Sequence, residues 1–148
     1  MEIPIEELVR HLSIIPDPRV DRTKHHPLES ILFIAICAIL SGADHWVEME
    51  EFGNTRKEWL SRFIDVSSGI PSHDTFGRVF AQLDPLEFQK SFLSWVRAVA
   101  VHIPGQVVSI DGKTLRRSHD GVRGLGPLHL VSAWAQGNHL VLGQVKTE

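Results

Sequence analysis

The sequence predicts an α+β fold, in which a helical bundle over residues 1–104 precedes a small antiparallel sheet over residues 105–148. In the first part, apolar positions recur at helical spacing, and proline or glycine separates the segments. After Gly105 the pattern changes to the alternation that is typical of strands. The chain has 148 residues, 43% of them hydrophobic, so it can bury one core, or one core and an incomplete second one.

Two helices are predicted on either side of a proline-containing segment. Residues 3–15 (IPIEELVRHLSII) have apolar side chains at helical spacing, and two prolines follow them. Residues 27–42 (PLESILFIAICAILSG) begin with a proline suited to a first turn and end at Gly42, where a left-handed cap is expected. Because this second segment is apolar on nearly all sides, it is predicted to be the central, buried helix.

Three further helical segments are predicted before residue 104. Residues 44–64 have apolar faces, with Gly53-Asn54 as a possible break between two helical pieces. Residues 70–84 (IPSHDTFGRVFAQLD) offer Ser72 as an N-cap ahead of a helical pattern. The last segment, residues 84–103, begins with an aspartate, a proline and a glutamate in the order of an N-cap, a first turn and a capping box.

The sheet is predicted from three short segments. The strands are expected at residues 107–110 (VVSI), 128–135 (LHLVSAWA) and 139–146 (HLVLGQVK). Residues 136–138 (QGN) suit a hairpin turn between the last two strands.

Composition favours a cytoplasmic protein. The single cysteine, Cys37, lies in an apolar run and cannot form an internal disulfide, as expected in a reducing compartment. No signal peptide is visible, and the longest apolar run, residues 31–40, is shorter than the roughly 20 residues that a membrane helix needs. We therefore expect no membrane partner.

The net charge of −3 does not indicate a nucleic-acid-binding protein. Residues 1–103 are net acidic, whereas residues 104–148 are net basic. Two local clusters of cations stand out, RVDRTKHH at residues 19–26 and GKTLRRSHDGVRG at residues 112–124. Any DNA binding is therefore expected to come from local clusters.

Asp111 is the strongest candidate for a chemical role. In the run VVSIDGKTLRRS it ends a predicted strand and precedes a glycine, so its carboxylate would be rigidly held and open to a close approach. Carboxylate oxygens are the ligands that Mg²⁺ prefers, and a pair of such ions supports phosphodiester chemistry. Asp-Gly is also a common turn dipeptide, so the residues alone leave a metal ligand and a turn aspartate both open.

The run VVSIDGKTLRRS, followed by GPLHLVSAWAQGNHLVLGQVKTE, resembles the start of the catalytic domain of bacterial insertion-sequence transposases of the ISAs type, also called H-repeat-associated proteins. The segments HPLESILFIAICAILSGADHWVEMEEFG and GIPSHDTFGRVFAQLDP resemble the N-terminal associated domain of that family. The resemblance covers nearly the whole chain. It implies that residues 1–104 are the associated domain and that residues 105–148 begin an incomplete RNase H-like DDE catalytic domain.

The same resemblance implies the catalytic residue and the cofactor. Asp111 is the first aspartate of a DDE triad, which holds two Mg²⁺ or Mn²⁺ ions for DNA strand cleavage and transfer. The other two acids of the triad lie beyond the third strand in the family, and Glu148 is a terminal residue unsuited to replace them. Because one carboxylate cannot organise a pair of ions, we expect this polypeptide alone to bind no metal stably and to cleave no DNA.

Two groups of residues are candidate DNA contacts. Lys113, Arg116 and Arg117 lie in a glycine-containing loop beside Asp111 and could contact phosphate; Arg123 is a weaker candidate, and a solvated loop is the alternative. The segment SHDTFGRVF could be the second helix of a helix–turn–helix, the alternative being an ordinary surface helix. The side chains of that helix expected to face DNA are Ser72, His73, Thr75 and Arg78.

Three functions are compatible with these features. The first is the N-terminal portion of a nucleoid-associated DDE transposase that binds element ends, inactive as this chain. The second is a non-catalytic regulator that binds DNA or dimerises with itself or with full-length transposase. The third is a small nuclease using Asp111 with another acid such as Asp120. The resemblance to RNase H-like sheets also implies that the strand at residues 107–110 lacks a neighbour on one side, and such an unpaired edge predicts self-association.

Overall fold

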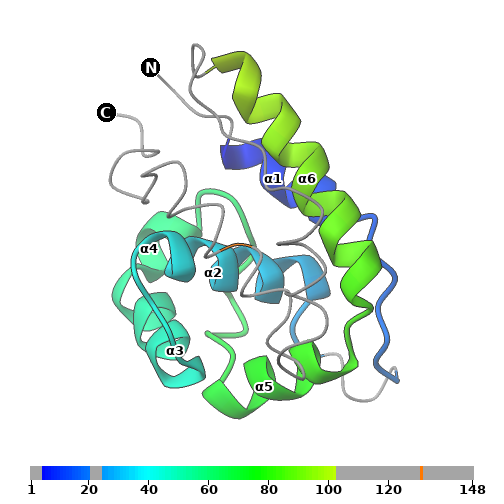
Figure 1. Cartoon of the computed structure of the whole chain (residues 1–148). Coiled ribbons are helices and arrows are strands. Elements are labelled where there is room, and N and C mark those ends of the chain that lie inside the picture. Colours follow the sequence, from blue (N-terminus) through cyan, green and yellow to red (C-terminus); the bar gives the residue numbers. More distant parts are fainter. Residues whose placement is uncertain (1–4, 21–24, 103–130, 132–148) are drawn as a thin grey trace.

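A computed structural model describes residues 5–20 and 25–102, together with residue 131. In these residues the chain forms a bundle of helices around α2, with α1 and α6 side by side, α3 and α4 on the opposite side, and α5 below (Figure 1). The helices are α1 (Ile5–Leu12), α2 (Leu28–Leu40), α3 (Trp46–Thr55), α4 (Lys57–Leu60), α5 (His73–Gln82) and α6 (Pro85–His102). The order and approximate positions of the predicted helices are confirmed.

Helix α2 is the centre of the core, as its composition predicts. Every residue from Ser30 to Leu40 is buried, and the ring of Phe33 lies 5.7 Å from that of Phe63. At the C-terminal end, Gly42 has a φ of 103°; its N–H donates to the carbonyl of Ile39, and the N–H of Ala43 donates to that of Ala38. This is the Schellman arrangement, which favours glycine because its positive φ strains other residues.

An aromatic series joins α3, α5 and α6. Trp46 stacks on Phe80 with ring centroids 5.5 Å apart, and Phe80 meets Phe88 at 6.1 Å. Phe88 stacks on Phe92, which in turn lies 5.9 Å from Trp95. Each such pair adds about 0.5–1.5 kcal/mol to the burial of its rings, so the series fixes α5 against both neighbouring helices.

The predicted break between two helical pieces is present, but it lies at Arg56, between α3 and α4, and not at Gly53-Asn54. Helix α3 continues to Thr55, and Gly53 is buried where α3 meets Ile70. A Cβ built on Gly53 would lie 2.5 Å from Cγ2 of Ile70, closer than packed atoms can approach. The glycine is therefore explained by close packing and not by a turn.

The predicted α+β fold class is wrong for the part of the chain that the structure describes, which is helical and contains no strand. Val131 belongs to the predicted strand at residues 128–135, yet it is helical and fully buried. A short apolar run suits a buried helix as well as a strand, which explains the error. The other two predicted strands and the boundary at residue 104 lie outside the described residues.

None of the described helices is both long enough and apolar enough to span a membrane.

Candidate nucleic-acid interface

Helix α5 begins at the cap that the sequence predicts. The hydroxyl of Ser72 accepts a hydrogen bond from the backbone N–H of Thr75 at 3.3 Å, and its Oγ also lies 3.2 Å from Oγ1 of Thr75. Substituting such a cap typically costs about 1 kcal/mol. Ser72 is therefore occupied in starting the helix, although its side chain remains exposed.

His73 fastens α5 to α3. Its backbone N–H donates to Oε1 of Glu50 at 2.8 Å, and its ring Nδ1 lies 2.8 Å from the same oxygen. The hydrogen bond with Glu50 raises the pKa of His73, and the hydrogen bonds from His73 lower the pKa of Glu50. The two shifts agree that this contact favours the charged pair, so His73 has a role in positioning α5 that its sequence context did not reveal.

The outer side of α5 forms a groove with the connection between α1 and α2. The groove has a volume of about 470 Å³. Its lining combines side chains more than fifty positions apart in the sequence, and we call it the basic groove: Arg19, His25, His26, Thr75, Arg78, Val79 and Gln82. Two of the predicted DNA contacts, Thr75 and Arg78, therefore lie in one concave site with part of the 19–26 cluster.

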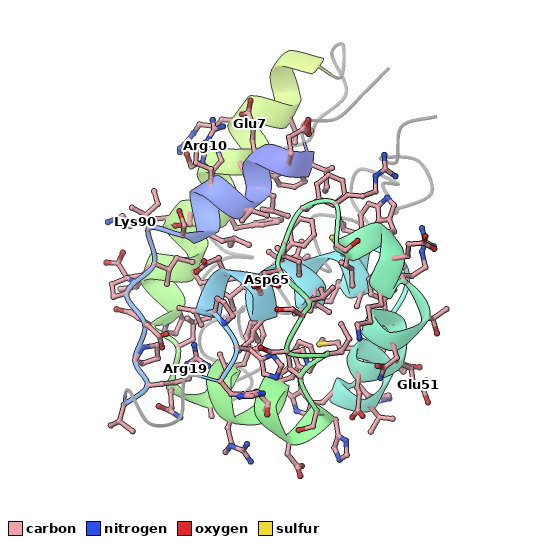
Figure 2. All side chains as sticks on the ribbon, turned by 180° about the vertical axis from the view of Figure 1, so that it is seen from behind. Glu7, Arg10, Arg19, Glu51, Asp65 and Lys90 are labelled. Carbon is pink, nitrogen blue, oxygen red and sulfur yellow. The ribbon has the colours of Figure 1, made fainter. Side chains whose placement is uncertain are left out.

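Arg19 shapes one wall of the basic groove. Its guanidinium Nε and Nη2 donate to the two carboxylate oxygens of Asp17 at 2.9 and 2.8 Å, and Nη2 also donates to the backbone carbonyl of His26 at 2.8 Å. Arg19 lies on the connection between α1 and α2 (Figure 2), and only 4% of its side chain is exposed. Because Asp17 balances its charge, Arg19 can hold the backbone carbonyl of His26 in position.

The remaining groups leave the basic groove positively charged. Arg78 is exposed, and Nη2 donates weakly to Oγ1 of Thr75 at 3.4 Å. Among the described residues, no carboxylate lies within ion-pair distance of Arg78. Partial burial lowers the pKa of His26, and the neighbouring charges of His25 and Arg19 lower it further. The groove can therefore accept an anion, with Arg78 as a charged donor and Thr75 as a hydroxyl donor.

The geometry differs from the predicted helix–turn–helix. Residues 61–72 separate α4 from α5, whereas that motif joins its two helices by a turn of about three or four residues. Helix α5 packs instead against α3. The sequence indicated the basic cluster at residues 19–26 as a possible source of DNA binding, but it did not predict that Arg19, His25 and His26 share one groove with α5.

The other predicted site residues lie outside the described residues. They are Asp111, Lys113, Arg116 and Arg117. Within the described ranges, no three side chains of the metal-ligating types gather closely enough to hold an ion. The predicted Mg²⁺ or Mn²⁺ site at Asp111 therefore stays a prediction.

The bundle and its groove define a small helical domain with an anion-accepting face. Comparison with known proteins identifies its family: residues 9–96 match the DDE_Tnp_1-associated family, and the chain belongs to it. Its role is transposase-related, and the predicted resemblance to H-repeat-associated transposases is confirmed.

Three relatives illustrate the similarity. The chain is 44% identical, over 97% of its length, to 37% of "Putative transposase YncI" of Escherichia coli O157:H7. It is 41% identical, over 97% of its length, to 38% of "H repeat-associated putative transposase YhhI" of Escherichia coli K12. Over 53% of its length it is 42% identical to 93% of "Inactive transposase YbfQ" of the same strain. The chain thus spans little more than a third of the length of the first two relatives, and no solved structure matches it.

Proposed function

We propose that the helical domain binds DNA on behalf of a transposase, and that the basic groove contacts the DNA backbone. The observation that carries this proposal is the meeting of Thr75 and Arg78 of α5 with His25 and His26 of the α1–α2 connection. Arginine, a hydroxyl and imidazole are donors that commonly hold phosphate oxygens. The family of the chain supplies the biological context, because transposases act on DNA.

The surface charge supports a local contact and not a general attraction. The whole chain carries a net charge of −3, so non-specific attraction to DNA is weak. Binding then depends on a small number of phosphate contacts in the groove, and each contact adds a measurable salt dependence. We assign DNA contact to the helical domain; Asp111, the residue predicted for strand cleavage, lies outside the described residues.

Fluorescence anisotropy with a labelled duplex carrying the ends of the insertion sequence tests the proposal on the full chain. Arg78→Ala should weaken binding about tenfold, since one charge-assisted hydrogen bond contributes roughly 1.5 kcal/mol. The slope of log K against log salt concentration should fall by about 1. Arg10→Ala is the matched control, because Arg10 is exposed on α1 and lies far from Arg19 in Figure 2. Equal affinity of the Arg78→Ala variant and the parent would refute the assignment of the groove.

A second function, a regulator that binds DNA without cleaving it, uses the same groove. The relative YbfQ is named an inactive transposase, and this chain covers 93% of its length. In a mixture with an active transposase, the chain would then compete for the element ends. Loss of this competition in the Arg78→Ala variant is the expected result, and competition that persists in the variant would contradict it.

A further inference from the structure

The basic groove contains a protonation site beside its one exposed arginine. His26 is partly buried in the groove wall, and Arg78 is exposed on the facing helix. An imidazole held among cations tends to remain neutral, because a proton on it would be repelled and poorly solvated. A bound anion reverses this balance, since its charge attracts the proton back to the ring.

We propose that the basic groove is a proton-coupled phosphate site, in which one phosphodiester of DNA lies between Arg78 and His26 and binding draws a proton onto His26. This inference rests on the proposed function and specifies the chemistry of the same groove. The ligand is a tetrahedral phosphate oxyanion, held by the guanidinium of Arg78, the hydroxyl of Thr75 and the imidazolium of His26. The DNA backbone is the source to which we assign it, because phosphodiesters are its repeating charge.

The charged and titratable neighbours of His26 support this assignment. On its own segment, Arg19 donates to the backbone carbonyl of His26 and is paired with Asp17, while the ring of His25 lies 4.8 Å away in an edge-to-face arrangement. From α5, Arg78 lines the same groove. Glu29 in the first turn of α2 does not line it. Among the described residues that line the groove, the uncompensated charge is therefore positive, and we assign an anion as its partner.

Burial and repulsion hold the pKa of His26 below its ordinary value of 6.5 in the free protein. Phosphate raises it in the complex, so the complex binds more protons than the free protein. Affinity for DNA must then increase as the pH falls through the pKa of the complex, and it levels off below the pKa of free His26. One coupled proton gives at most about a tenfold change per pH unit.

The variant His26→Gln isolates this effect. Glutamine removes the titration and keeps a side-chain donor, and the carbonyl that Arg19 binds belongs to the backbone and remains. His11→Gln is the matched control, because it removes a histidine of α1 that does not line the groove. Circular dichroism of the full chain checks that each variant folds.

The experiment measures anisotropy of the labelled end duplex from pH 8 to pH 5.5 at constant ionic strength, for the parent and both variants. DNA phosphodiesters do not titrate in this range, so a change in affinity reflects the protein. We expect a rise of fivefold to tenfold per pH unit in the parent and in His11→Gln, and a flat profile in His26→Gln. The ring proton resonances of His26 should also titrate at higher pH with the duplex than without it.

The outcomes separate the inference from the proposed function. A profile of His26→Gln as steep as that of the parent overturns the proton-coupled site, while DNA binding itself would stand. Absence of parent binding at every pH overturns the proposed function. Inorganic phosphate serves as a competitor: displacement only at millimolar concentrations supports a DNA phosphodiester, whereas saturation at micromolar concentrations would reassign the groove to free phosphate.

Discussion

The ion pair of Arg19 and Asp17 gives the sharpest test of how the basic groove is built. Asp17 accepts hydrogen bonds from the backbone N–H, Nε and Nη2 of Arg19, at 3.0, 2.9 and 2.8 Å. Asp17→Ala would leave a guanidinium that is 4% exposed without a counter-charge. Breaking a buried pair costs about 3–5 kcal/mol, and the lower figure applies because 20% of the Asp17 side chain reaches water.

Urea unfolding of the full chain measures this cost. With a slope of about 2 kcal/mol per molar, a loss of about 3 kcal/mol lowers the midpoint by about 1.5 M. Asp17→Asn keeps an acceptor oxygen and should lose less. Glu51→Ala, which removes an exposed carboxylate of α3, should change the free energy of unfolding by less than about 0.5 kcal/mol. An Asp17→Ala variant as stable as the Glu51→Ala control would show that Arg19 is solvated and does not hold His26 in position.

Two further predictions concern the contacts that place α5. Gly53→Ala should lower stability by about 1–2 kcal/mol in the same assay, because its Cβ meets Ile70 at 2.5 Å and this overpacking exceeds the gain in helix propensity; an unchanged or higher midpoint would contradict the close packing. The pair of Glu50 and His73 makes stability depend on pH. Because the pKa of His73 is raised, its contribution to stability is complete below its ordinary pKa of 6.5 and is lost as the pH rises through the raised pKa of the folded state. Because the pKa of Glu50 is lowered, its contribution is complete above its ordinary pKa of 4.5 and is lost as the pH falls through the lowered pKa of the folded state. Glu50→Gln should therefore lose most stability, relative to the parent, between about pH 4.5 and 6.5, and a deficit that does not vary from pH 4 to 9 would be inconsistent with this ion pair.

Helices were predictable from the sequence because their signals are local. The apolar run of α2 and the cap at Ser72 each act within a few residues, so spacing alone locates them. The roles of Gly53 and His73 depend instead on partners elsewhere, Ile70 for the first and Glu50 for the second. No periodicity reveals such contacts, so the sequence predicted neither the packing of Gly53 nor the hydrogen bonds of His73.

The groove shows the same division. The basic cluster at residues 19–26 and the polar face of α5 were each visible in the sequence. Their meeting depends on how the α1–α2 connection crosses α5, which packing of the whole bundle decides. The strand prediction failed for a different reason, since Val131 lies in a short apolar run whose burial is compatible with either type of structure.

The stacking of Trp46 on α5 determines which side of the groove can yield. Gly77 leaves room for the indole of Trp46, because a Cβ built at Gly77 would lie 3.4 Å from its Nε1. The same indole stacks on Phe80. Because this packing supports α5 from the core side, α5 forms a rigid wall of the groove. A change of shape on binding a partner is then expected in the opposite wall, where the guanidinium of Arg19 bonds to Asp17.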